Sequence, residues 1–134
     1  MRLTKDLYNH SLTLLTDFYQ ITMAYAYWKN GMAERQSVFN LYFRENPFSG
    51  GYAIACGLDY IVDYLEHFKF TASDIEFLST IKSNSGHPLF EDAFLKYLSN
   101  LSFSCDIDAL PEGSLVFPHE PIIRVIGPVI QSQI

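Results

Sequence analysis

The sequence predicts an α+β domain in which helices pack on a mostly antiparallel or mixed sheet, as a sandwich rather than a barrel. The chain has 134 residues, which is enough for a single domain spanning 1–134 with one hydrophobic core. Hydrophobic residues make up 49% and charged residues 18%, a composition typical of folded proteins. The helix and strand patterns follow in the order α, β, β, α, α, α, β, β, β, so early and late strands have to meet across the helices between them.

The first strong pattern is a helix over residues 17–30. Thr16 can cap it through its hydroxyl, or Asp17 can do so together with Gln20 as a capping box. Gly31 then follows as a typical C-terminal stop. Apolar residues recur at helical spacing, at Phe18, Ile21, Ala24, Tyr25 and Trp28.

The next two elements are strands. Residues 36–44 are rich in β-branched and aromatic side chains, and their apolar residues fall on both faces, which predicts a central strand covered on both sides. Residues 45–51 (ENPFSGG) form a loop because they contain Asn-Pro, Ser-Gly and Gly-Gly. A short apolar strand follows over 52–56, and Gly57 ends it.

Three helices occupy the middle of the chain. Residues 58–68 place their apolar side chains on one face, as an amphipathic helix does. The segment 71–74 (TASD) is a cap sequence that starts a helix running to about Ile81. After the loop 82–88 (KSNSGHP), residues 90–100 form another amphipathic helix.

The last part of the chain is predicted to be β-structure. Strands are expected over 103–110, 114–117 and 121–126, with a turn at 111–113. Gly127-Pro128 and the apolar-polar run after them are typical of the opening of a further helix rather than of a natural tail. We therefore expect the chain to be the N-terminal piece of a longer protein.

Charge and composition exclude several classes of function. Lys and Arg total 9 against 15 for Asp and Glu, and a net charge of −6 argues against a nucleic-acid partner. No apolar run approaches the roughly 20 residues of a membrane helix, and the N-terminus lacks the apolar region of a secretory signal. Two cysteines are too few for a disulfide framework, which predicts a cytoplasmic protein.

The usual catalytic constellations are absent from the sequence. No glycine-rich phosphate loop is present, and the histidines are too scattered for a metal site, so neither a metal ligand nor a catalytic residue is expected. Cys56 is expected to be buried and inert, and Glu112 to be solvated beside its turn. The four histidines are His10, His67, His87 and His119.

Asp17 and Tyr19 stand in the first turn of the helix over 17–30. A helix N-terminus favours anions and presents free N–H groups, and Tyr19 adds a flat face and a hydroxyl suited to a ring. The structural alternative is that Asp17 only caps the helix and Tyr19 packs on a neighbour. The residue types alone favour this alternative.

Arg44 ends a predicted strand and leads into a glycine-rich loop, a place from which its guanidinium can fork onto a phosphate. The alternative is a surface arginine paired with Glu45 or another acid, and residue types alone favour it slightly. The long segment 110–128 is predicted to be a compact β corner without chemistry of its own.

Four segments, taken in order, resemble the N-terminal part of nicotinate phosphoribosyltransferases. They are LLTDFYQITMAYAYWKNG (14–31), FRENPFSGGYAIACGLDYIVDYL (43–65), FTASDIEFL (70–78) and LPEGSLVFPHEPIIRVIGP (110–128). The resemblance implies the N-terminal α/β sandwich domain of a type II phosphoribosyltransferase, followed by an α/β barrel beyond residue 134. It also implies conversion of nicotinate and phosphoribosyl pyrophosphate to nicotinate mononucleotide and pyrophosphate in NAD salvage. ATP hydrolysis through a phosphorylated histidine drives the family's reaction, and Mg²⁺ serves the pyrophosphate.

The same resemblance implies roles for three residues and a homodimer. The subunits of the family pair head to tail, so this portion is expected to complete the partner's site. Tyr19 is then expected to stack on the pyridine ring of nicotinate, and Arg44 to reach a phosphate of the phosphoribosyl substrate. Asp17 is assigned to the substrate site or to capping alone, since an ionised Asp17 would repel a carboxylate substrate.

Two classes of function stay open at this level. In the first, the chain is part of an enzyme, is inactive alone, and binds neither Mg²⁺ nor ATP by itself. In the second, it is a stand-alone, non-catalytic module that binds a ligand or forms a dimer. Within the enzyme class, a homologue that acts on quinolinate or nicotinamide is less favoured than one that acts on nicotinate. Continuation of the reading frame past Ile134 into a sequence of barrel length would separate the two classes.

Overall fold

The computed structural model of the chain describes residues 11–134. The helices are Phe18–Lys29 (α2), Leu58–Glu66 (α3), Ala72–Thr80 (α4), Asp92–Ser99 (α5) and Val129–Gln133 (α6), and Pro47–Ser49 forms a short 3₁₀ turn. The strands are Gln36–Leu41 (β1), Ala53–Ile54 (β2), Asp106–Ala109 (β3), Leu115–Val116 (β4) and Ile123–Pro128 (β5). This mixture of helices and antiparallel strands confirms the predicted α+β class.

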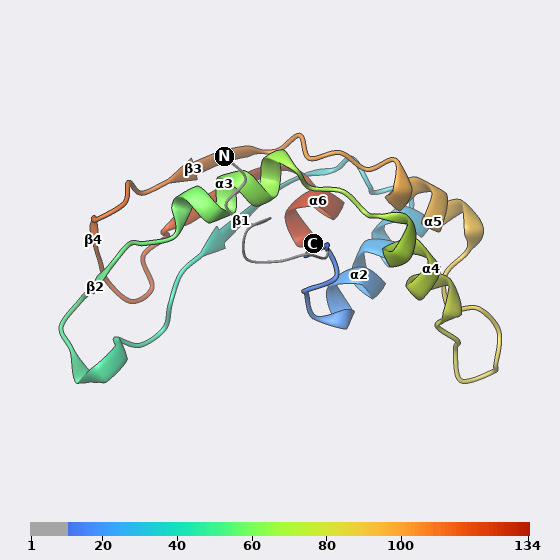
Figure 1. Cartoon of the computed structure of the whole chain (residues 1–134), viewed down its shortest axis with the longest axis horizontal. Helices are drawn as coiled ribbons and strands as arrows, with labels where there is room; N and C mark the ends of the chain where they lie inside the picture. The colour runs from blue at the N-terminus through green and yellow to red at the C-terminus, as the bar shows by residue number, and fades with distance from the viewer. Residues whose placement is uncertain (1–10) are drawn as a thin grey trace.

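These elements form an arch (Figure 1). One limb of the arch, the helical limb, consists of α2, α4 and α5. The other, the β limb, consists of β2, β4 and the 3₁₀ turn. The strands β1 and β3 and the helix α3 run along the top and connect the limbs, while α6 lies beneath the span and packs on α2. The arch separates the start of α2 from the 3₁₀ turn, a separation that matters for the candidate site.

The main sheet has three antiparallel strands in the order β1–β5–β3. In its register, Leu41 of β1 and Ala109 of β3 both pair with Ile123 of β5. The prediction that residues 36–44 form a central strand is therefore wrong, because β1 is an edge strand that ends at Leu41. Apolar residues on both faces of a strand do not fix how many neighbours it has. Here β5, rather than β1, bonds to a strand on each side.

A second sheet joins only β2 and β4 and forms the core of the β limb. Ala53 pairs with Val116 and Ile54 pairs with Leu115. Since successive side chains of a strand point to opposite faces, Val116 lies on the inner face, where it is buried, and Ile54 and Leu115 share the outer face. Both outer residues are more than half exposed, so this face is open in the described chain.

The hydrophobic core lies in the helical limb and beneath the main sheet. Phe94 of α5 is its centre, with ring centroids 5.0 Å from Tyr25 and 5.6 Å from Trp28 of α2. Burial of each such large side chain stabilises the fold by about 1.5–3 kcal/mol. The buried members of this cluster are Ile21, Ala24, Phe70, Leu78, Phe90, Phe94, Leu95, Leu98, Val129 and Ile130. The apolar stripe predicted for the first helix supplies two of them, and the predicted helix after Pro128 (α6) supplies two more.

The capping contacts of α4 agree with the sequence prediction, whereas those of α2 differ from it. At α4, Thr71 and Asp74 form the predicted capping box: the Thr71 N–H donates to Asp74 Oδ2 at 2.7 Å, and the Asp74 N–H donates to Thr71 Oγ1 at 3.4 Å. At α2, Asp17 occupies the N-cap position, but its side chain makes no capping hydrogen bond. The predicted capping box with Gln20 is wrong, because Gln20 bonds to Tyr19 and to Gln133 of α6 instead.

Helix α3 is capped from elsewhere in the chain. Its N-cap is Gly57, in a left-handed conformation with φ of 104° that suits glycine. The Glu112 carboxylate, from the turn between β3 and β4, accepts hydrogen bonds from the N–H groups of Gly57 and Leu58. Glu112 is exposed, as expected, but it also has a role that the sequence did not indicate, because the helix start places two free donors beside it.

Cys56 is exposed, which contradicts the prediction that it is buried. The inward and outward alternation of β2 continues just beyond its end: the Ala55 N–H still bonds to the Ser114 carbonyl and Ala55 is 8% exposed, whereas its neighbour Cys56 is exposed. Cys105, beside β3, is partly buried. In the part of the chain that the structure describes, no helix is long and apolar enough to cross a membrane.

Candidate functional site

Tyr19 presents its ring to solvent at the start of α2. The residue is 54% exposed, and no other aromatic ring contacts it within residues 11–134. Its hydroxyl accepts a hydrogen bond from Gln20 Nε2 at 3.0 Å, and the Gln20 Oε1 in turn accepts one from Gln133 Nε2 of α6. The ring is thus held at one edge while its faces remain available to a flat ligand.

Asp17 lies two positions before Tyr19 and is exposed. Its backbone carbonyl accepts the first hydrogen bond of the helix, from the Gln20 N–H at 2.9 Å, but its carboxylate makes no capping bond. The structure therefore brings Asp17 and Tyr19 together at one helix end. A carboxylate that does not cap its own helix stays free to face a ligand or solvent.

Arg44 lies on the other limb, beyond the end of β1. It is exposed and makes no ion pair within the described residues, so the alternative of a pair with Glu45 has no contact to support it. Within residues 11–134 its guanidinium donors are unpaired, as binding of a phosphate requires. Two residues further on, the side-chain oxygen of Asn46 is buried and has no hydrogen-bond partner in residues 11–134.

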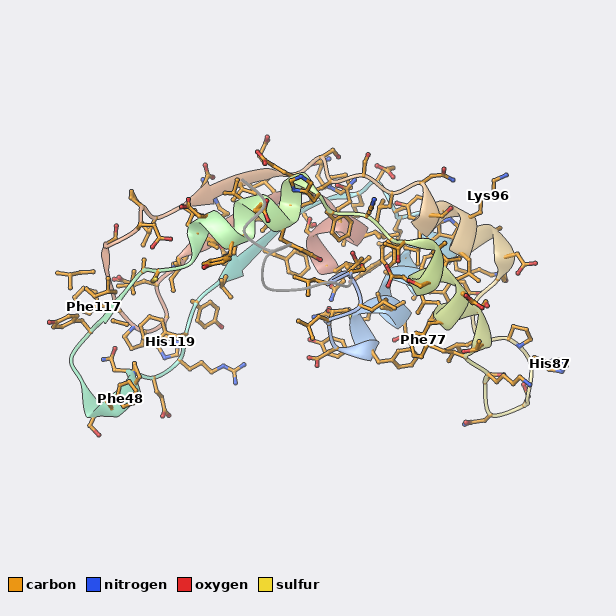
Figure 2. All side chains as sticks on the ribbon, in the orientation of Figure 1. Phe48, Phe77, His87, Lys96, Phe117 and His119 are labelled. Carbon is orange, nitrogen blue, oxygen red and sulfur yellow. The ribbon has the colours of Figure 1, made fainter. Side chains whose placement is uncertain are left out.

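The loop after Arg44 has an unusual backbone. Phe48 and Ser49 both adopt left-handed conformations, with φ of 57° and 53°, which side-chain-bearing residues rarely do. The pair turns Phe48 fully into solvent, with a relative exposure of 101%. Figure 2 shows its ring at the tip of the β limb, in the same region as Phe117 and His119.

Arg44 and Tyr19 do not meet within one chain. Figure 1 places the start of α2 in the helical limb and the segment after β1 in the opposite limb. The residues predicted to bind substrate thus form two separate half-sites on the described chain. Each of them needs a further surface to become an enclosed ligand site.

An apolar cavity of about 190 Å³ lies inside the β limb, next to the Arg44 segment. It is lined mainly by aliphatic side chains from β2, α3, β4 and β5, including Ala53, Leu58, Ile61, Val116 and Ile123. Such a lining offers little to fix a charged ligand, and Glu112 at its edge already caps α3. The cavity therefore does not compete with the two half-sites as a site for phosphate.

Titratable groups do not assemble into a catalytic centre in the described residues. No group of three or more His, Cys, Asp or Glu side chains there could hold a metal ion. Burial, with the Glu34 carboxylate nearby, raises the pKa of Tyr97 to about 12, but its ring packs on the core residue Phe94, with 6.4 Å between the ring centroids, and belongs to neither half-site. His67 contacts the Asp63 carbonyl at 2.7 Å within α3, and His10 lies outside the described residues.

Two residues have structural features that their sequence context did not predict. Glu112 caps α3, as described above, and His119 adopts a left-handed backbone with φ of 66° between β4 and β5. The sequence carried one signal for His119: it stands in a short connection with a proline before it and another two positions after it, where the chain must turn sharply.

The chain is similar to one known family over most of its length. A sequence model of one family, described as the nicotinate phosphoribosyltransferase (NAPRTase) N-terminal domain, matches residues 14–134. The chain belongs to this family. Asp17, Tyr19, Arg44 and His119 all fall inside the matched residues.

Individual nicotinate phosphoribosyltransferases are similar over nearly the whole chain. Nicotinate phosphoribosyltransferase 2 of Arabidopsis thaliana is 49% identical over 117 residues, which are 87% of this chain and 20% of that protein. The nicotinate phosphoribosyltransferase of Bacillus subtilis (strain 168) is 44% identical over 124 residues, covering 92% of this chain and 24% of that protein. This chain thus spans about a fifth to a quarter of the length of these relatives.

A solved structure agrees with the fold. The crystal structure of human nicotinic acid phosphoribosyltransferase matches with a TM-score of 0.76 at 39% sequence identity, over 88% of this chain and 23% of that chain. The similarity therefore extends to the arrangement of helices and strands, and the resemblance that the four sequence segments indicated is confirmed.

Proposed function

We propose that the complete protein is a nicotinate phosphoribosyltransferase of NAD salvage. It would convert nicotinate and phosphoribosyl pyrophosphate, with ATP hydrolysis, to nicotinate mononucleotide and pyrophosphate. A bond forms between the pyridine nitrogen and C1 of the ribose, and the bond from C1 to the pyrophosphate oxygen breaks. The observation that carries the proposal is the family match over residues 14–134, together with 49% identity to a plant nicotinate phosphoribosyltransferase.

Tyr19 is proposed to bind the pyridine ring. Its ring is half exposed and free of other rings in the described chain, and its hydroxyl is held by Gln20. An aromatic face fixed at one edge can stack on a flat heterocycle without first having to be ordered. The stacked ring would be oriented so that its nitrogen faces the ribose.

Arg44 is proposed to bind a phosphate of the phosphoribosyl substrate. Its guanidinium is exposed and unpaired in residues 11–134, and such a fork can bind two phosphate oxygens at once. The positive charge would also offset the negative charge that the departing pyrophosphate gains.

Asp17 is proposed to face the substrate and to contribute less to binding than Tyr19 and Arg44. Its carboxylate is exposed and makes no capping bond. It stands near the proposed ring site, where an ionised Asp17 would repel the nicotinate carboxylate. Asp17→Asn is therefore expected to leave binding of nicotinate intact or to strengthen it.

The two half-sites support a homodimer in which this portion completes the partner's site. Because Tyr19 and Arg44 lie on opposite limbs, neither is enclosed by the described chain itself. The complete enzyme is proposed to be a cytoplasmic dimer, and residues 1–134 alone to be inactive. Mg²⁺ and ATP are proposed as its cofactors. No cluster in the described residues fits a metal ion, so no step is assigned to a metal bound by this portion.

The test is phosphoribosyl transfer by the protein expressed from its complete reading frame, with nicotinate and, separately, with nicotinamide. Turnover with nicotinate alone is expected. Tyr19→Ala should raise the KM for nicotinate, and Arg44→Ala the KM for phosphoribosyl pyrophosphate. In each case we expect the KM to increase about tenfold or more, since a lost charged or stacked contact is worth at least about 1.4 kcal/mol.

Matched variants control for the loss of a surface side chain. Tyr60 of α3 is an exposed tyrosine, and Arg35 is an exposed arginine without an ion pair in the described residues. Tyr60→Ala and Arg35→Ala should keep normal kinetics. No turnover with either base, or full activity in both site variants, would refute the proposal and leave this chain as a structural module.

A further inference from the structure

His119 holds a backbone conformation that needs an explanation. It lies in the connection between β4 and β5 with φ of 66°, in the left-handed region that side-chain-bearing residues seldom enter, although histidine does so more often than most. Residues held in such conformations cluster at functional sites. This connection belongs to the segment that the sequence marked as a compact corner without chemistry of its own.

The left-handed turn aims the His119 backbone at the segment that leads to Arg44. The His119 N–H donates a hydrogen bond to the Phe43 carbonyl at 2.9 Å, and the Ile122 N–H donates to the Leu41 carbonyl at 2.8 Å. The regular pairing of β1 with β5 ends at Leu41. The connection therefore continues to hold the chain for two residues beyond the end of the strand.

The His119 side chain adds a second contact to the same segment. Its ring lies 5.9 Å from the Tyr42 ring, centroid to centroid, with the planes tilted by 45°. Figure 2 shows His119 at the end of the β limb, in the region of Phe48 and Phe117. Tyr42 and Phe43 are thus held by the backbone and by the ring of one residue.

Arg44 is the next residue along the chain and has no ion pair of its own in residues 11–134. The direction of its side chain therefore depends on the backbone at Phe43. We propose that His119 is a positioning residue for Arg44: it fixes Tyr42 and Phe43 so that the guanidinium reaches the phosphate without further ordering. This inference rests on the phosphate-binding role proposed for Arg44.

The test is a double-mutant cycle in the complete enzyme, with the KM for phosphoribosyl pyrophosphate, the KM for nicotinate and kcat as readouts. The variants are His119→Ala, Arg44→Ala and both together. His119→Asn serves as the conservative variant, because asparagine also tolerates the left-handed turn and keeps the backbone N–H. His87→Ala is the control, since His87 is an exposed loop histidine without a side-chain bond in the described residues.

His119→Ala is expected to raise the KM for phosphoribosyl pyrophosphate about tenfold and to leave the KM for nicotinate nearly unchanged, because a small misplacement of a substrate contact has large effects. His119→Asn should have a smaller effect in the same direction. In the Arg44→Ala background, His119→Ala should change the KM for phosphoribosyl pyrophosphate less than twofold, since a residue that acts through another has nothing left to position.

Three results would overturn the inference. An equal effect of His119→Ala in both backgrounds would show that His119 acts independently of Arg44, whose own role would stand. A parallel loss of kcat, of both KM values and of melting temperature would show a merely structural role. An Arg44→Ala variant with normal kinetics would overturn this inference and the proposed role of Arg44 together. If His119→Ala does not fold, the same cycle with His119→Asn decides.

Discussion

The carboxylate of Glu112 accepts hydrogen bonds from the backbone N–H groups of Gly57, at 2.7 Å, and of Leu58, at 2.6 Å. These donors belong to the start of α3, which carries no capping side chain of its own. A residue 54 positions further along the chain than Leu58 thus supplies the cap. The contact joins the top of the arch to the β limb that carries Arg44.

Glu112→Ala is expected to destabilise the protein by about 1–2 kcal/mol, the range found when a helix N-cap is lost. Two helix donors would then lose their partner, and α3 would lose its link to the turn before β4. Denaturant unfolding of the complete protein measures the change. Glu45→Ala is the control, because Glu45 is exposed and makes no ion pair in the described residues. Equal stability of the two variants would show that the cap contributes nothing.

Gly127→Ala is expected to destabilise the fold by about 1–3 kcal/mol, as overpacking in a tight interior does. A Cβ at this position of β5 would lie 2.5 Å from the Cys105 sulfur and 2.9 Å from the Cys105 Cβ. Adding Cys105→Gly should recover part of the loss, because it removes both of these atoms. Gly51→Ala, where the added atom meets nothing within 4 Å, serves as the control in thermal unfolding. A Gly127→Ala variant as stable as the control would contradict the close approach.

The stability of the protein is expected to fall between pH 10 and about pH 12 in part through Tyr97. Burial, with the Glu34 carboxylate nearby, raises the pKa of Tyr97 to about 12 in the folded state, against about 10 in an unfolded chain. The folded state therefore holds the proton more tightly. The contribution is complete below pH 10 and is lost as the pH rises through the folded pKa.

Tyr97→Phe should flatten this alkaline fall, since it removes the titrating hydroxyl. Burial also raises the pKa values of Tyr25 and Tyr64, so part of the fall should remain in the variant. Melting temperatures measured from pH 8 to 12 give the comparison, with Tyr60→Phe as an exposed reference. Curves of identical shape for the wild type and Tyr97→Phe would argue against this assignment.

A mixture of Tyr19→Ala and Arg44→Ala subunits is expected to stay inactive. If both side chains complete the partner's site, as proposed, every site of a mixed dimer lacks one of them. Refolding the two variants together and assaying phosphoribosyl transfer tests this directly. Recovery of activity would show instead that the two limbs of the arch, which Figure 1 separates, serve different sites.

Local patterns predicted local structure well. The apolar spacing from Phe18 to Trp28 and the cap at Thr71 and Asp74 predicted α2 and α4 to within a residue or two, because their signals lie within a few turns of chain. The segment after Gly127 likewise forms the expected helix. These elements are determined by backbone geometry and by neighbouring side chains.

Relationships between distant segments were not predictable in the same way. The edge position of β1 depends on β5, and the cap of α3 depends on Glu112. The exposure of Cys56 depends on the bond between its neighbour Ala55 and Ser114. Each depends on a partner far along the chain. Residue types placed Tyr19 and Arg44 among the candidates, but only the fold shows that they lie on opposite limbs. Their roles stay predictions until the variants are measured.

The central place of β5 has a consequence for synthesis on the ribosome. Strand β1 ends at Leu41 and β3 ends at Ala109, but both pair with a strand that begins only at Ile123. At translation rates of about 5–20 residues per second, β1 waits on the order of ten seconds for its partner. During that time Val38 and Leu41 offer an unpaired, apolar edge to other nascent chains. The vulnerable period of this protein therefore comes before its sheet exists, and chaperone capture of the emerging chain should concentrate there.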